Sequence, residues 1–153
     1  MIRAEAPTGE ASRVLFAEYM ALVRERLGDA FTPSEDIFAT EDAFDGPGTA
    51  WLVVYENGRP VACGGLRPLE PGVGEIKRMF VTAAARRRGH GRALLAELER
   101  RALAAGYDRV RLYTTEVLYE ALALYDHAGY RRVDIAPVDE RADDVWLEKR
   151  LFA

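Results

Sequence analysis

The fold is decided by one stretch of sequence, Val81-Thr82-Ala83-Ala84-Ala85-Arg86-Arg87-Arg88-Gly89-His90-Gly91-Arg92. An apolar strand pattern ends at its first residue, and a pattern typical of a helix begins near its last glycine. The N–H groups that start a helix have no partner inside it, and they carry the positive end of the helix dipole. Two glycines one residue apart leave that backbone uncovered. The stretch therefore predicts an anion-binding turn between a strand and a helix.

Four arginines lie within residues 86–92, although the chain as a whole has a net charge of −4. Their fixed positive charge beside a bare helix start suits a diphosphate. The common nucleotide motifs are absent: no Gly-x-x-x-x-Gly-Lys-Ser/Thr occurs, and no Gly-x-Gly-x-x-Gly follows a strand. The simpler alternative is a glycine pair with arginines that only starts a solvated helix.

The sequence before this stretch predicts a helix and then antiparallel strands. Apolar residues recur at helical spacing from Leu15 to Leu27, and Gly28 ends that helix. Asn57-Gly58 indicates a tight hairpin, because both positions tolerate positive φ. The expected strands are residues 2–6, 51–55, 61–66 and 75–81, with a turn at 68–74 and an acidic loop at 29–48 that has one helical turn around 37–44.

The sequence after the stretch predicts helices that alternate with strands. Gly106 and Gly129 are suited to end the two helices. The expected helices are residues 91–105 and 118–128, and the expected strands are 109–115, 130–135 and 145–152. We therefore expect an α+β fold, a three-layer α/β/α sandwich with a mixed, mostly antiparallel central sheet and helices on both faces.

The composition is that of one globular domain over residues 1–153. Apolar residues make up 49% and charged residues 30%, which excludes a disordered or fibrous chain. The negative net charge argues against a protein that coats nucleic acid or an anionic membrane. Cys63 is the only cysteine, so an internal disulfide and a cysteine-rich metal site are excluded. No signal-peptide pattern or membrane-spanning run is present, and we expect a cytoplasmic protein without a metal.

Two motifs resemble those of a known family. Arg86-x-x-Gly89-x-Gly91, preceded by Met79-x-Val81 and followed by Arg-Ala-Leu-Leu, resembles the acetyl-coenzyme A (acetyl-CoA) signature of the GCN5-related N-acetyltransferase (GNAT) family. Residues 121–130, Ala-Leu-Ala-Leu-Tyr-Asp-His-Ala-Gly-Tyr, are similar to the family's later Ala-x-x-Leu-Tyr-x-x-x-Gly-Phe/Tyr block. The motifs cover residues 75–95 and 112–130, and the expected order of elements agrees along the whole chain.

The resemblance implies a GNAT-like acyl-CoA N-acyltransferase fold that splays between strands 75–81 and 109–115, with acetyl-CoA in the split. Backbone groups of Met79 and Val81 would bond the pantetheine arm, and backbone groups of residues 87–92 would wrap the pyrophosphate. The implied cofactor-binding residues are Met79, Phe80, Val81, Arg86, Arg87, Arg88, Gly89, His90, Gly91 and Arg92.

The implied reaction is aminolysis of a thioester. An alkylamine has a pKa of about 10.4, so the enzyme must remove a proton to obtain the nucleophile. It must stabilise an oxyanion, for which the N–H of Met79 is a candidate. It should also protonate a leaving thiolate with a pKa of about 8.5. Tyr125 is the candidate acid, because a tyrosine is protonated at neutral pH and the family often carries one at this position. The alternative is an ordinary core aromatic.

Glu75 is the candidate base. It lies eleven positions before Arg86, the spacing at which the histone-modifying branch of the family carries its catalytic glutamate. By strand alternation we expect Glu75 to share a face with Lys77, Met79 and Val81. The alternatives are that Glu75 pairs with an arginine or binds the ammonium group of the substrate.

Other reactive side chains have weaker cases. His90 and His127 are further possible proton carriers, and Cys63 as an acyl carrier has no partner base in sight. The neighbouring Gly64-Gly65 indicates a bulge or a close backbone approach. Leu118 occupies a position where many family members have Asn, so that contact is missing or is replaced by Thr115 or Glu116.

We expect the acceptor to be a small amine or an amino-acid-like molecule, because an acidic rim within residues 29–45 would attract a cation. A protein lysine or N-terminus stays open as acceptor, as do other acyl groups such as propionyl or succinyl and a homodimeric state. Alternatives of another class are a non-catalytic acyl-CoA sensor and a nucleic-acid-binding module that uses the cluster Arg86–Arg92. The negative net charge and the absence of interleaved aromatics argue against nucleic acid.

Overall fold

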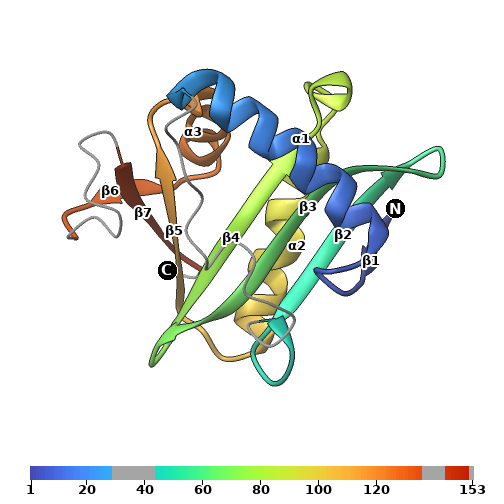
Figure 1. Ribbon diagram of the computed structural model, residues 1–153. Helices are drawn as coiled ribbons and strands as arrows, with labels where there is room; N and C mark the ends of the chain where they lie inside the picture. Colours follow the sequence, from blue (N-terminus) through green and yellow to red (C-terminus); the bar gives the residue numbers. More distant parts are fainter. Residues whose placement is uncertain (29–43, 136–143, 152–153) are drawn as a thin grey trace.

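The computed structural model describes residues 1–28, 44–135 and 144–151. Within these ranges seven strands form one sheet, in the order β1-β2-β3-β4-β5-β7-β6 (Figure 1). The strands are β1 (Ile2–Ala4), β2 (Ala50–Glu56), β3 (Arg59–Glu70), β4 (Val73–Val81), β5 (Arg109–Thr115), β6 (Arg131–Val133) and β7 (Asp144–Arg150). The helices are α1 (Glu10–Leu27), α2 (His90–Ala104), α3 (Tyr119–His127) and the short 3-10 helix η3 (Ala83–Ala85).

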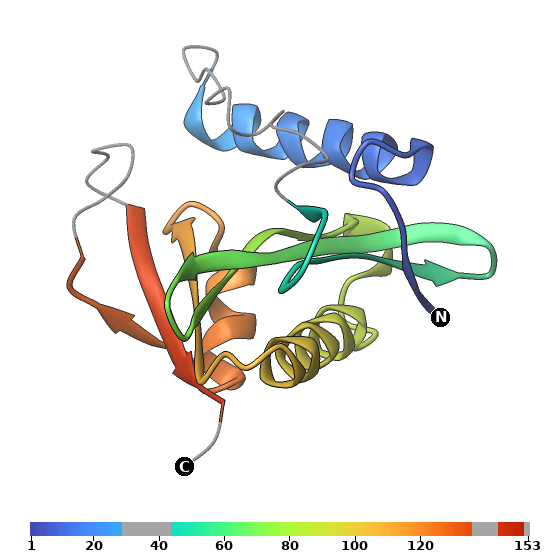
Figure 2. The same cartoon turned by 90° about the horizontal axis from the view of Figure 1, so that it is seen from below.

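The helices cover both faces of the sheet. Figure 2 shows α1 alone on one face, with α2 and α3 on the other. The pairing of β4 with β5 is parallel and every other strand pairing is antiparallel. The expected α+β sandwich with a mixed, mostly antiparallel sheet is therefore confirmed. None of the helices in the described ranges is long and apolar enough to cross a membrane.

Each face of the sheet has its own apolar core. The core beneath α2 includes Leu94 and Leu98, both fully buried against strand residues such as Ile76. The core beneath α1 is smaller and includes Trp51 and Phe80. Burying a leucine side chain contributes about 1.5–3 kcal/mol, so the α2 face supplies much of the stabilisation that holds β4 in place.

Strand β4 contains a bulge at Arg78. Cys63 lies opposite Phe80 and Gly65 lies opposite Lys77, so β4 has one residue more than β3 between these pairs. Arg78 has φ +57°, a left-handed conformation that is uncommon for a residue with a side chain. The extra residue reverses the alternation of side chains beyond this point.

The prediction that Glu75 shares a face of the sheet with Met79 and Val81 is therefore wrong. Met79 and Val81 pack against the core beneath α2, together with Ile76. Glu75 is the neighbour of Ile76 in a regular part of the strand, so its side chain lies on the opposite, α1 face. The carboxylate and the two residues nearest the expected cofactor arm do not share a face.

The glycine pair in β3 permits close packing on both faces. A Cβ atom at Gly64 would lie 2.9 Å from Cγ of Met79, and one at Gly65 would lie 2.4 Å from Cε1 of Phe44. Both distances are shorter than a Cβ atom allows, so the glycines make room for neighbouring side chains rather than for a close backbone approach. The other interpretation, a bulge, agrees with the register shift between Cys63 and Gly65.

Strands β3 and β4 are longer than expected. The expected turn at 68–74 shrinks to Pro71 and Gly72, because Pro68 is paired with Gly74 inside the sheet. A register shift follows Pro68, and such an irregularity is where a strand tolerates a residue without an N–H group. Most of the helical turn expected around 37–44 lies outside the described residues.

Strands β4 and β5 separate before they end. Their parallel pairing runs from Val73 opposite Arg109 to Ile76 opposite Leu112 and stops there. Strand β4 continues to Val81 and β5 to Thr115 without pairing to each other. The splay implied by the family resemblance is present.

Candidate active site

The separated strands open a cleft of about 810 Å³ that passes through the sheet. Tyr19 and Leu22 of α1 line it on one face, and α2 and α3 line it on the other. Nine of the ten implied cofactor residues line this cleft; the exception is Arg88. The complete lining is Tyr19, Leu22, Met79, Phe80, Val81, Ala85, Arg86, Arg87, Gly89, His90, Gly91, Arg92, Leu118, Tyr119, Glu120, Ala121, Ala123, Leu124 and Tyr125.

The start of α2 is open toward the cleft. Gly89 occupies the N-cap position with φ +84°, and no side chain caps the helix. The N–H of Ala93 donates to the carbonyl of Gly89 at 3.0 Å, so the N–H groups of residues 90–92 precede the first helical hydrogen bond. Arg87 also has positive φ, +67°, so the turn that leads into α2 contains two left-handed residues, Arg87 and Gly89.

Gly91 sets the distance between α2 and its neighbours. A Cβ atom there would lie 3.0 Å from Cδ2 of Leu124 and 3.2 Å from Cγ2 of Val81. The missing side chain lets the helix start approach both β4 and α3. This position therefore fixes the width of the cleft at its charged end.

The arginines of the turn have different partners. Arg87 and Arg92 are exposed at the cleft, and neither makes an ion pair with another residue in the described ranges. Arg88 instead points toward β2, where it pairs with Glu56, which also contacts Nε2 of His90. The hydrogen bond from His90 and the charge of Arg88 hold the pKa of Glu56 below its usual value.

A second carboxylate joins three elements around the cleft. Arg26 of α1 donates two hydrogen bonds to Glu120 of α3, at 2.7 and 2.6 Å, and a third to the carbonyl of Val117 at 2.9 Å. Arg86 approaches the same carboxylate at 3.3 Å and donates through Nε to the carbonyl of Val81 at 3.3 Å. The hydrogen bonds from Arg26 lower the pKa of Glu120 to about 2, with the charge of Arg86 contributing. Sequence reasoning missed Arg26 and Glu120, because 94 positions separate them.

Tyr125 lies at the inner end of the cleft. It is 5% exposed, and its ring centroid is 5.8 Å from that of Tyr130. Burial raises the pKa of Tyr125 well above its usual value, and the nearby phenol of Tyr19 adds to this. The hydroxyl is therefore protonated at any ordinary pH and can donate a proton or a hydrogen bond.

Glu75 lies outside the cleft, on the α1 face of the sheet. It is 3% exposed, and its Oε1 accepts a hydrogen bond from Nε of Arg67 at 2.9 Å. Arg67 stands directly opposite it on β3. The pairing with an arginine that the sequence left open is thus present, and it orients the carboxylate toward β3.

The remaining candidates lie away from the cleft or lack the required chemistry. His127 is exposed, and its Nδ1 lies 2.7 Å from the carbonyl oxygen of Ala123. Burial raises the pKa of the Cys63 thiol to about 12, so the thiol is neutral at physiological pH and a poor nucleophile.

At position 118, where many family members have Asn, this chain places an apolar side chain in the cleft. Leu118 lines the cleft as an apolar residue. Glu116 is engaged elsewhere, in an ion pair with Arg132 at 2.7 Å. The buried hydroxyl of Thr115 has no hydrogen-bond partner among the described residues. Neither of the two suggested replacements lines the cleft.

The described ranges contain no group of three or more His, Cys, Asp or Glu side chains that could hold a metal ion. The polar side chains that line the cleft carry guanidinium groups, phenols, the imidazole of His90 and the carboxylate of Glu120.

Comparison with known sequences identifies a family. The sequence profile of the Acetyltransferase (GNAT) family matches residues 16–130. The uncharacterized N-acetyltransferase YjgM of Escherichia coli is 37% identical over 93 residues; the match covers 59% of this chain and only 56% of that relative. An IAA acetyltransferase of Azospirillum brasilense is 32% identical over 127 residues, which cover 82% of this chain and 83% of the relative.

Solved structures show the same fold over nearly the whole chain. A putative acyl-CoA N-acyltransferase from Klebsiella pneumoniae has a TM-score of 0.78 and 28% identity, with 99% of this chain and 97% of that chain covered. A GNAT-family acetyltransferase from Staphylococcus aureus has a TM-score of 0.81 at 17% identity, with 99% and 100% covered. The second of these, at its low identity, supports the fold alone.

The Arg26–Glu120 pair predicts a specific acid sensitivity. The folded-state pKa of Glu120 lies below its ordinary value of 4.5, so the pair stabilises the fold fully above about pH 4.5 and progressively less as the pH falls toward 2. We expect the melting temperature of Glu120→Gln to be lower than that of the wild type at pH 7, with the difference shrinking over this window. Differential scanning fluorimetry from pH 7 to pH 3 measures it, and Asp126→Asn, which changes an exposed carboxylate of α3, is the control. Parallel curves for wild type and Glu120→Gln would contradict the role of the pair.

Proposed function

Because the chain belongs to the acetyltransferase (GNAT) family, we propose that it moves an acetyl group from acetyl-CoA to the primary amine of a small or amino-acid-like acceptor. One observation carries this proposal: the uncapped start of α2 opens into the cleft beside Arg87 and Arg92, which have no ion-pair partner in the described ranges. Such a site needs an anionic ligand with at least two charges. The diphosphate of coenzyme A meets that need.

The unpaired edge of β4 suits the pantetheine arm. Between Lys77 and Val81 this strand pairs with β3 on one side, and no strand of the described residues pairs with it on the other. Backbone groups of Met79 and Val81 line the cleft there, and a ligand amide could bond them as an added strand would. This places the thioester near the bulge, where the N–H of Met79 is our candidate for binding the oxyanion.

Tyr125 is our candidate for the general acid. In the reaction the neutral amine attacks the thioester carbonyl, the C–N bond forms, the C–S bond breaks, and the departing sulfur takes a proton. A phenol with a raised pKa is a weak acid, but it is fully protonated and lies in a water-poor site beside the cleft. These properties suit a donor that acts only as the thiolate develops.

Glu75 stays our candidate base, and its position restricts how it could act. Its carboxylate lies on the α1 face, so it could take the amine proton only from an acceptor that approaches from that face. The hydrogen bond from Nε of Arg67 holds the carboxylate against β3 and limits the directions from which an amine can approach it. Orientation of the acceptor ammonium is the other role compatible with this position.

The alternative hypothesis, that the arginine cluster binds nucleic acid, is less well supported. Glu120 engages Arg86 and Glu56 engages Arg88, so half of the cluster has carboxylate partners and does not present a continuous basic surface to nucleic acid. The small-molecule acceptor, the cytoplasmic location and a homodimer stay predictions.

Arg87→Gln tests the cofactor site, with Arg88→Gln as the matched control. We expect Arg87→Gln to raise the Kd for acetyl-CoA about tenfold, because a charged hydrogen bond to phosphate is lost. Arg88 is held by Glu56 outside the cleft, so its variant should change the Kd little. Isothermal titration gives both values, and thiol release with a panel of primary amines measures transfer.

S-acetylpantetheine, which lacks the diphosphate, should bind both variants as it binds the wild type. Absence of acetyl-CoA binding by the wild type would overturn the proposal. Binding without thiol release on any amine would favour a sensor instead.

Tyr125→Phe tests the acid. We expect kcat to fall about 100-fold or more, with the Kd for acetyl-CoA unchanged, because only the hydroxyl is removed from a buried ring. The loss should be smaller for a thioester whose leaving thiol has a lower pKa, such as an acetyl thioester of an arylthiol. An equal loss for both leaving groups would show that the hydroxyl does not protonate the sulfur.

Glu75→Gln tests the base through the pH dependence of kcat/KM. If Glu75 accepts the amine proton, its variant loses the acidic limb that the carboxylate imposes on the profile, and kcat/KM falls at least about 100-fold. Arg67→Gln, which removes only the partner of the carboxylate, should keep that limb. A Glu75→Gln profile of unchanged shape would leave the residue a structural or substrate-binding role.

A further inference from the structure

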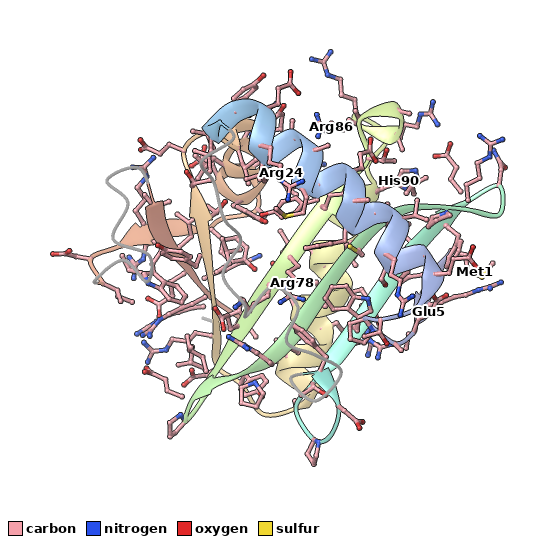
Figure 3. All side chains as sticks on the ribbon, in the orientation of Figure 1. Met1, Glu5, Arg24, Arg78, Arg86 and His90 are labelled. Atoms are coloured by element: carbon pink, nitrogen blue, oxygen red, sulfur yellow. The ribbon has the colours of Figure 1, made fainter. Side chains whose placement is uncertain are left out.

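A second cavity, of about 370 Å³, lies between the first half of α1 and the sheet; we call it the α1 cavity. It lies over β2, β3 and β4 rather than over the split between β4 and β5. Its lining residues are Pro7, Thr8, Ser12, Arg13, Phe16, Ala17, Tyr19, Trp51, Cys63, Arg78 and Phe80. Arg78, at the bulge of β4, lies on the α1 face near the middle of the sheet, whereas Arg86 and His90 lie at the end where α2 begins (Figure 3).

The α1 cavity and the cleft share a wall. Tyr19 and Phe80 line both, and their rings meet edge to face with centroids 5.5 Å apart. The cleft crosses the sheet through the split beside β4, so its end on the α1 face reaches this pair of rings. The two cavities therefore adjoin at Tyr19 and Phe80, which border both of them.

The α1 cavity is lined mainly by apolar side chains, together with two arginines. Phe16, Trp51 and Phe80 supply aromatic surface, and the indole N–H of Trp51 is already satisfied by Ser12 at 2.8 Å. Arg13 and Arg78 are its charged residues, and no acidic side chain of the described ranges lines it. Such a cavity favours a ligand with an apolar body and an anionic group.

We propose that the α1 cavity holds the acceptor, and that the acceptor is an α-amino acid with an apolar or aromatic side chain. The side chain would lie against Phe16 and Trp51, and the carboxylate would face Arg13. The α-amine would then lie beside Tyr19 and Phe80, where it could reach the thioester carbonyl in the cleft. This inference rests on the proposed function: the amine nitrogen bonds to the acetyl carbon, coenzyme A leaves as the thiol, and one amine proton passes to the solvent or a base.

A substitution on α1 that narrows the cavity tests whether the acceptor binds there. Ala17 is exposed on the helix and lines the cavity, so Ala17→Leu should narrow it with little effect on folding. With L-phenylalanine as the probe, we expect KM for the amino acid to rise about tenfold while KM for acetyl-CoA stays the same. Ala21→Leu is the control, because Ala21 is exposed one turn later and lines neither cavity.

The charge of the cavity is tested with a matched pair of probes. Phenethylamine has the body of L-phenylalanine without the carboxylate, and the wild type should prefer the amino acid in kcat/KM. Arg13→Gln should reduce that preference about fivefold, and Arg24→Gln, an exposed arginine of α1 that lines neither cavity, should not.

The outcomes separate this inference from the function on which it rests. Thiol release with amines together with an unchanged KM in Ala17→Leu would overturn the α1 cavity as the acceptor site and leave the acetyltransferase standing. Turnover of phenethylamine or spermidine but not of any amino acid would overturn the carboxylate requirement. Acetyl-CoA binding without turnover on any amine would overturn both.

Discussion

The rest of the site depends on the end of pairing between β4 and β5. Beyond Ile76 and Leu112 the facing edges of the two strands no longer bond each other. Backbone N–H and C=O groups inside a protein require partners, so an opening of this kind persists only where water or a ligand can satisfy them. The bulge at Arg78 strengthens the separation, because an extra residue increases the local twist of a strand. A gap that would destabilise an ordinary sheet thus becomes a channel from one face to the other.

The charges around this channel are balanced by two carboxylates. The four guanidinium groups of residues 86–92 would repel each other at the start of α2, and Glu120 and Glu56 offset much of that repulsion. Glu120 joins Arg26 and Arg86, and Glu56 joins Arg88 and His90. Arg87 and Arg92 are left for a ligand. The same carboxylates also fix the walls, because Glu120 connects α3 to α1 and to the turn.

The sequence predicted the elements that follow local rules and missed what depends on distant pairing. The open helix start followed from Gly89, Gly91 and their arginines, since both the glycine geometry and the charge are local. The bulge could not be predicted, because Arg78 sits in an unbroken strand pattern and nothing in that pattern marks a left-handed residue. One undetected residue was enough to assign Met79 and Val81 to the wrong face relative to Glu75. The link between Arg26 and Glu120 joins positions that only the tertiary fold brings together, since α1 and α3 lie on opposite faces of the sheet.

Because the cleft and the α1 cavity adjoin at Tyr19 and Phe80, their arrangement favours transfer of the acetyl group from the thioester to the acceptor in one step. A carrier on the enzyme would have to reach both cavities, and Cys63 lines the α1 cavity but not the cleft. Its buried thiol has a pKa raised to about 12, so the thiolate that would accept an acetyl group is scarce at neutral pH. An amine has no such obstacle once it is neutral, since nitrogen attacks without first forming an anion. Burial of the one cysteine and the opening of the sheet beside Phe80 therefore favour the same mechanism, direct attack of the acceptor on the thioester.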